Sequence, residues 1–287
     1  MKLLATLLAL PLLLLASPAA ASQRFEVTVE GKGPDVILIP GLASSQAVWD
    51  ATAAHLEQRY RLHRISVSGF GGAPAAANAE GAIVAPVAEA IADYIQREKL
   101  NAPAIIGHSL GGETALMIAA RHPDRVGRIL IVDALPFYSL VMNPAATVES
   151  VLPQADMLRD MLLRQTPEQA SAGQAASIAR LVKTEGARAG PLADAKASDP
   201  NVVARAMHEL MTTDLRPELG RIEARTTVLY AHDPAYGVPA EAVDALFRSA
   251  YSGLAGVKLE RVDGSFHFIM HDQPAAFQAA VDRFLGQ

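Results

Sequence analysis

The 287-residue chain contains no cysteine, a single tryptophan and few aromatic residues. The absence of cysteine excludes disulfides, thiolate metal sites and a cysteine nucleophile. Aromatic residues make up 5% of the chain, which argues against a platform for stacking bases or sugars. The formal net charge of −5 argues equally against a basic surface that binds nucleic acid. With 51% hydrophobic residues, the composition is that of a globular chain holding one large domain or one and a half ordinary ones.

The first 21 residues have the pattern of a secretory signal peptide. Lys2 precedes an apolar run from Leu3 to Ala16, and small residues up to Ala21 fit a cleavage site before Ser22. The run is shorter than the ~20 residues that a membrane-spanning helix requires. We therefore expect an exported protein, periplasmic or secreted, with no membrane span in its mature chain. Because disulfides are excluded, its stability must come from a large hydrophobic core.

Segments with strand and helix patterns alternate along the rest of the chain. Strands are expected at 25–29, 36–40, 62–67, 104–106, 128–132, 226–230 and 257–262, the first two forming a hairpin. Helical spacing occurs in 47–60, 84–98, 112–121, 240–249 and 274–285. Strands separated by helices predict an α/β fold with a parallel sheet covered on both faces.

Residues 136–222 interrupt this alternation. They contain helical patterns at 148–164, 167–183 and 201–212 but no clear strand. We interpret them as a helical cap inserted between two strands of the sheet. The core domain would then consist of residues 22–135 and 223–287.

Ser109 is the predicted nucleophile. It lies in Gly107-His108-Ser109-Leu110-Gly111, which follows an apolar strand and opens a helix, the setting that a G-x-S-x-G nucleophile turn requires. So sharp a turn needs a strained backbone at the serine and neighbours without side chains. The alternative is a glycine-rich helix entry with a capping serine.

A serine nucleophile needs a base, and His267 is the candidate among eight histidines. It follows the last expected strand and precedes the last helix, so its loop can reach the carboxyl edge of the sheet. His271, four residues on, leaves open a metal-binding pair. No glutamate follows the first histidine of that pair, so the zinc-protease motif is absent.

Two aspartates compete for the role of the acid that orients the base. Asp233 directly follows the strand at 226–230, and the order Ser109, Asp233, His267 is the one expected for this architecture. Asp133, at the end of the strand at 128–132, is the alternative. Asp272 is interpreted as a helix cap before Pro274.

Two backbone amides are predicted to form an oxyanion hole. The amide of Leu110 follows the nucleophile at the positive end of a helix dipole. Pro40-Gly41-Leu42 ends a strand and can direct the Leu42 amide at the same oxygen; the alternative is an ordinary strand exit. Trp49 is expected in the core, and no role is derived for the turn at 69–72, which lacks the spacing of a dinucleotide-binding motif.

Together these motifs resemble the α/β-hydrolase superfamily, and the resemblance covers almost all of the chain after residue 22. It implies an eight-stranded, mostly parallel sheet with a cap after the sixth strand. It also implies Ser109 as nucleophile, Asp233 as acid, His267 as base, and the Leu42 and Leu110 amides as oxyanion donors. A serine at position 109 disfavours the dehalogenase and epoxide-hydrolase branches, which use aspartate.

The predicted function is cleavage of carboxylic esters of small molecules through an acyl-serine intermediate, with neither cofactor nor metal. The alternatives on the same residues are a lactonase, an aminopeptidase or amidase, and a carbon–carbon bond hydrolase. A non-catalytic binding protein on the same fold is the alternative of another class. Methionines in the cap are interpreted either as an adaptable apolar pocket for acyl or alkyl groups or as plain core (Met142, Met157, Met161, Met207 and Met211). The oligomeric state is left open.

Overall fold

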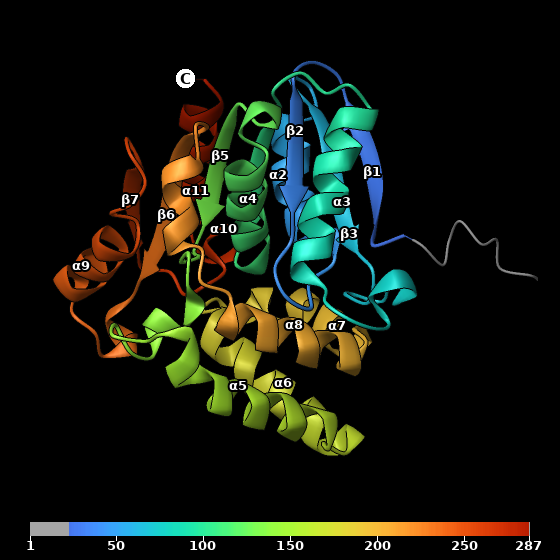
Figure 1. Ribbon diagram of the computed structural model, residues 1–287, viewed down its shortest axis with the longest axis vertical. Coiled ribbons are helices and arrows are strands. Elements are labelled where there is room, and N and C mark those ends of the chain that lie inside the picture. The colour runs from blue at the N-terminus through green and yellow to red at the C-terminus, as the bar shows by residue number, and fades with distance from the viewer. Residues whose placement is uncertain (1–22, 287) are drawn as a thin grey trace, which may run out of the picture.

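A computed structural model describes residues 23–286, so the expected signal peptide lies outside the described residues. Seven strands form one sheet in the order β1-β3-β2-β4-β5-β6-β7 (Figure 1). All neighbouring strands are parallel except the edge pair β1–β3. Their bounds are β1 Phe25–Gly31, β2 Asp35–Ile39, β3 Arg61–Val67, β4 Ala104–His108, β5 Arg128–Val132, β6 Arg225–His232 and β7 Lys258–Asp263.

Two expectations about the sheet are corrected. The sheet of the described residues has seven strands, not eight. The expected hairpin of the first two strands is also wrong, because β1 pairs with β3, placing Phe25 opposite Val67. The physical reason is that both edges of β2 are already occupied by β3 and β4, so the antiparallel strand can add only beyond β3.

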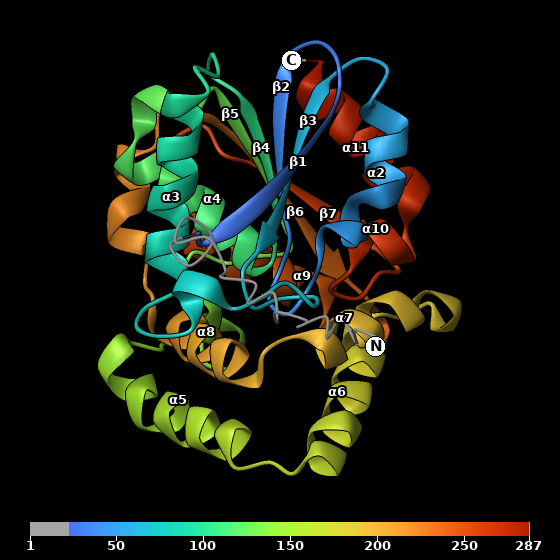
Figure 2. The ribbon, with the colours of Figure 1, turned by 90° about the vertical axis from the view of Figure 1, so that its right-hand side faces the viewer.

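Helices cover both faces of the sheet, as Figure 2 shows. One layer consists of α3 (Val84–Arg97), α4 (Leu110–Arg121) and α9 (Ala240–Ala250), and the other of α2 (Asp50–Leu56), α10 (Ile269–Asp272) and α11 (Pro274–Leu285). Alternate residues of the central strands supply the two apolar layers: Ile105 faces the first and Ile106 the second, both fully buried. Burial of each such side chain stabilises the fold by roughly 1.5–3 kcal/mol.

Between β5 and β6 the chain is helical and lies across the carboxyl edge of the sheet, at the bottom of Figure 1. This cap consists of α5 (Val148–Leu163), α6 (Pro167–Leu181), α7 (Ala189–Ala197) and α8 (Pro200–Thr212). The side chains of Thr147 and Thr166 cap the first two of these helices in reciprocal capping boxes. The remaining helical turns are short 3-10 segments at 46–49, 76–78, 123–125, 138–141, 185–187, 216–221 and 234–236.

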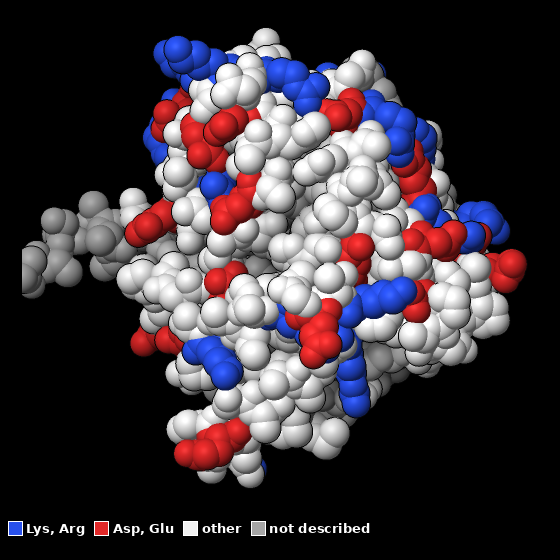
Figure 3. Space-filling model, turned by 180° about the vertical axis from the view of Figure 1, so that it is seen from behind, with Lys and Arg blue, Asp and Glu red and all other residues white. Residues whose placement is uncertain are grey.

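In the described part of the chain, every helix is too short or too polar to cross a membrane. On the face shown in Figure 3, acidic and basic side chains are interspersed among uncharged ones.

Candidate active site

Ser109 occupies a strained turn between β4 and α4. Its backbone dihedrals are φ 53° and ψ −122°, an unfavourable region for a residue with a side chain. A Cβ atom on Gly107 would lie 2.2 Å from the Gly111 carbonyl oxygen, and one on Gly111 would lie 2.3 Å from the Ile39 carbonyl oxygen. Both glycines are therefore required by close backbone contact, and the turn projects Ser109 from the carboxyl edge of the sheet.

The two predicted oxyanion donors flank this turn. Leu110 is the first residue of α4, so its amide has no carbonyl of a preceding helical turn to bond. The turn at residue 41 packs directly on Ser109, since a Cβ atom on Gly41 would lie 3.0 Å from Cβ of Ser109. In that turn the Ser44 amide donates to the Gly41 carbonyl, while no carbonyl of the described chain accepts from the Leu42 amide.

His267 lies in the loop between β7 and α10, beside the serine turn. Its Nδ1 is 2.7 Å from Oδ2 of Asp133, which leaves Nε2 as the basic nitrogen of the ring. His108, the residue before Ser109, contacts this loop: its ring centroid is 4.6 Å from that of His267, and its Nε2 donates to the His267 carbonyl at 3.1 Å. Burial, and to a smaller extent the neighbouring His267, holds the pKa of His108 well below its ordinary value. The His108 ring is therefore neutral and supports the histidine loop.

Asp133, not Asp233, is the carboxylate that contacts the histidine. Asp133 follows β5 in a left-handed conformation, with φ 49°. Its amide donates to the Leu229 carbonyl at 2.7 Å, and its Oδ1 accepts from the Ala231 amide at 2.8 Å. These two bonds tie Asp133 to the end of β6 and direct its second oxygen at His267.

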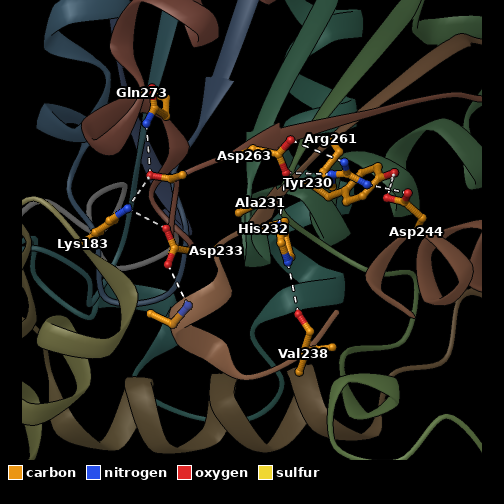
Figure 4. Close-up of polar contacts among 12 residues, drawn as sticks. Lys183, Tyr230, Ala231, His232, Asp233, Val238, Asp244, Arg261, Asp263 and Gln273 are labelled. Atoms are coloured by element: carbon orange, nitrogen blue, oxygen red, sulfur yellow. Dashed lines mark hydrogen bonds and ion pairs between the residues drawn. The ribbon is translucent and has the colours of Figure 1, made fainter. Parts of the chain in front are cut away.

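The expected pairing of Asp233 with His267 is thereby corrected. Oδ2 of Asp233 accepts from Nζ of Lys183, a cap residue, at 2.6 Å, and Oδ1 accepts from the Ala235 amide at 2.9 Å (Figure 4). Lys183 and then the Ala235 amide lower the pKa of Asp233. Both carboxylate oxygens are therefore occupied away from His267.

Trp49, Asp272 and the cap methionines lie outside the group formed by Ser109, His267 and Asp133. Trp49 is fully buried and stacks on Phe277, as expected for a core residue. Asp272 does not cap α11, which has no side-chain cap; its carboxylate instead binds amides of the cap and of the histidine loop, contrary to the expectation. The cap methionines divide, with Met211 buried, Met207 partly buried, and Met142, Met157 and Met161 exposed.

The turn at 69–72, for which the sequence predicted no role, contacts the cap. A Cβ atom on Gly71, where φ is +53°, would lie 2.4 Å from Cβ of Ser45. The Gly71 amide donates to the hydroxyl of Ser198 in the cap at 2.8 Å. Asp194 of α7 accepts at 2.8 Å from both the amide and the hydroxyl of Ser45, close to the oxyanion turn. Sequence periodicity could not reveal these contacts, because they join distant segments.

Glu113 is an unusual residue in the first turn of α4. It is fully buried, and neither carboxylate oxygen has a hydrogen-bond partner in the described chain. Burial, with a smaller effect from Glu209, raises the pKa of Glu113 well above the ordinary value of 4.5. Its carboxyl group is therefore held in the neutral form. The described residues contain no cluster of three or more His, Asp or Glu side chains suited to a metal ion.

Comparison with known proteins identifies the family to which the fold belongs. Residues 34–192, more than half of the chain, match the alpha/beta hydrolase fold family, and the chain belongs to that family. A pimeloyl-[acyl-carrier protein] methyl ester esterase of Nitrosomonas europaea is 32% identical over 120 residues, which cover 41% of this chain and 43% of the relative. The chain thus matches less than half the length of this curated relative.

Solved structures share the fold over nearly the whole chain. A hydrolase from Pseudomonas aeruginosa superposes with a TM-score of 0.74 at 22% identity, over 92% of this chain and 94% of the other. An enol-lactonase from Burkholderia xenovorans gives a TM-score of 0.73 at 21% identity, over 92% and 96%. At these identities the likeness defines the fold alone.

Gly111→Ala should destabilise the protein by about 3 kcal/mol, because the added methyl group overlaps the Ile39 carbonyl oxygen. Urea unfolding measures the effect. Gly190→Ala is the matched control: nothing lies within 4 Å of its added Cβ atom in α7, so stability should be unchanged or slightly increased. Equal stability of the two variants would contradict the proposed close contact.

Glu113→Gln should change how stability depends on pH. Because the pKa of Glu113 is raised on folding, its stabilising effect is complete below 4.5 and is lost as pH rises through the folded-state pKa. The free energy of unfolding of the variant, relative to the unsubstituted protein, should rise above pH 4.5 by up to about 1.4 kcal/mol per pH unit. Glu80→Gln, at an exposed residue, should give no such slope. If the difference in unfolding free energy between Glu113→Gln and the unsubstituted protein did not change with pH, the burial of Glu113 as a neutral acid would be contradicted.

Proposed function

We propose that the protein is a serine esterase that hydrolyses carboxylic esters of small molecules through an acyl-serine intermediate. The observation that carries this proposal is the 2.7 Å contact between Nδ1 of His267 and Asp133, in a loop packed against the strained Ser109 turn. Such a contact orients the ring so that Nε2 can accept a proton from the nucleophile. The esterase name of the Nitrosomonas europaea relative supports the same class of reaction.

In the proposed mechanism, His267 removes the hydroxyl proton of Ser109 as the oxygen attacks the ester carbonyl. The Leu42 and Leu110 amides stabilise the oxyanion of the tetrahedral intermediate. His267 then returns the proton to the leaving alcohol, which departs and leaves the acyl group on Ser109. Water, deprotonated by the same ring, attacks the acyl carbonyl, and the ring then returns this proton to the oxygen of Ser109 as the acid is released. Asp133 holds the ring and stabilises its protonated form throughout.

The proposed setting is outside the cytoplasm. The signal pattern at residues 1–21 supports export and a mature chain that begins near Ser22. The residues argued to carry the reaction need no metal or cofactor for these steps.

A fluorophosphonate probe should label Ser109 of the folded protein, because the probe reacts with serines that a neighbouring base activates. Mass spectrometry identifies the labelled residue, and a panel of p-nitrophenyl esters of graded acyl length, together with lactones, measures hydrolysis. Ser109→Ala should abolish both signals, whereas Ser252→Ala, an exposed serine in a loop, should retain them. Folded protein that is neither labelled nor active on the panel would overturn the proposed function.

Asp133→Asn should lower kcat by roughly 10⁴-fold, because a neutral amide cannot stabilise the protonated ring or fix the required tautomer. Asp233→Asn should have a much smaller effect, since that carboxylate binds Lys183 rather than the histidine. Steady-state kinetics on the best ester of the panel compares the two variants. A larger loss of kcat in Asp233→Asn would restore Asp233 as the acid and contradict the assignment.

A further inference from the structure

A short strip of the cap, residues 181–184, runs alongside the histidine loop. The Phe268 amide donates to the Leu181 carbonyl at 3.1 Å, so the residue that follows His267 is bonded directly to the cap. This strip begins at Leu181, the last residue of α6, and connects that helix to the rest of the cap. The loop that carries the proposed base is therefore not held by the core domain alone.

The carboxylate of Asp272 lies where the strip and the loop meet. Its Oδ2 accepts from the Phe266 amide at 2.9 Å and from the Lys183 amide at 3.1 Å, and its Oδ1 accepts from the Thr184 amide at 2.8 Å. One side chain thus binds two amides of the cap and the amide of the residue that precedes His267. Hydrogen bonds to an ionised carboxylate are roughly twice as strong as those between neutral groups.

The side chain of Lys183 adds a second link between the same two segments. Its Nζ donates to Asp233 at 2.6 Å and to the Gly264 carbonyl at 3.4 Å, and Nε2 of Gln273 donates to that carbonyl at 3.1 Å (Figure 4). Asp233 is 4% exposed, so this ion pair is well shielded on the carboxylate side. Both ends of the histidine loop are consequently bound to the cap or to Asp272.

We propose that Asp272 is a positioning residue that couples docking of the cap to the placement of His267; this inference rests on the proposed function. When the strip leaves the loop, the Phe268 amide loses its acceptor and Asp272 loses two of its three donors. The His267 ring is then free to move from its contact with Asp133. A displacement of about 1 Å at a catalytic group can lower the rate by roughly 10²-fold. The base is therefore aligned only beneath a docked cap.

Two substitutions on opposite sides of this contact test the coupling. Asp272→Asn replaces one accepting oxygen by an amide that cannot accept. Thr184→Pro removes one cap amide and leaves the carboxylate intact, and the φ of −70° at Thr184 already suits proline. Thr184→Ala, which keeps the amide, and Asp263→Asn, on an exposed carboxylate paired with Arg261, are the matched controls.

Both test variants should lower kcat 10- to 100-fold with little change in KM, while both controls match the unsubstituted enzyme. Proton NMR reports the placement of His267 directly. The signal is the low-field resonance of the His267–Asp133 hydrogen bond, assigned by its loss in Asp133→Asn, and a general loss of stability in the folded variants would leave it unchanged. It should weaken in Asp272→Asn and in Thr184→Pro. Amide exchange should quicken together in residues 181–184 and 264–268.

The outcomes separate this inference from the proposed function. Unchanged kcat and an unchanged resonance in the folded variants would overturn the coupling, as would a rise in KM alone, which would make the strip a substrate-binding element only. If Asp272→Asn does not fold, Thr184→Pro against Thr184→Ala decides the question by the same measurements. If the folded, unsubstituted protein hydrolyses no ester, the proposed function is overturned. The resonance in the variants would still report whether the cap positions His267.

Discussion

The close backbone contact between the turn at 107–112 and the end of β2 is the constraint on which the site depends. Carbonyl oxygens would lie within 2.3 Å of Cβ atoms added to Gly107 and Gly111, so the chain can turn this sharply only with glycine at both positions. That turn forces Ser109 into its strained conformation and starts α4 at Leu110. It also places His108 in contact with His267, so the loop bearing the proposed base packs against the Ser109 turn.

The cap is a part of this site and not only its cover. Asp194 and Ser198 bind the loops that follow β2 and β3, next to the proposed oxyanion turn. The strip at 181–184 binds the histidine loop through Asp272 and Lys183. These contacts are polar and directional, so they specify the position of the cap more sharply than apolar packing alone would. The loops that follow β2 and β3 and the histidine loop are therefore all bound to one inserted segment.

Much of the fold could be predicted because local patterns reflect local physics. The apolar segment at 104–106 and the helix after it appear where expected, as β4 and α4, because burial on both faces of a sheet leaves a clear signature. Helix α7 was missed, since the sequence AGPLADAKA has no apolar stripe and only Pro191 is buried. The hairpin prediction failed because a turn between two strands says nothing about which sheet edge is already taken.

The sequence by itself indicated a sharp turn at Ser109 and singled out His267, because both patterns consist of residues close together in the chain. Only the tertiary structure decided which aspartate contacts His267. Asp133 and Asp233 both follow neighbouring parallel strands, so their positions along the chain are equivalent. The choice depends on where each carboxylate points. The end of β6 orients Asp133, whereas Lys183 of the cap, fifty residues away in sequence, binds the carboxylate of Asp233. The first of these contacts forms only when β5 and β6 pair, and the second only when the cap lies against the sheet.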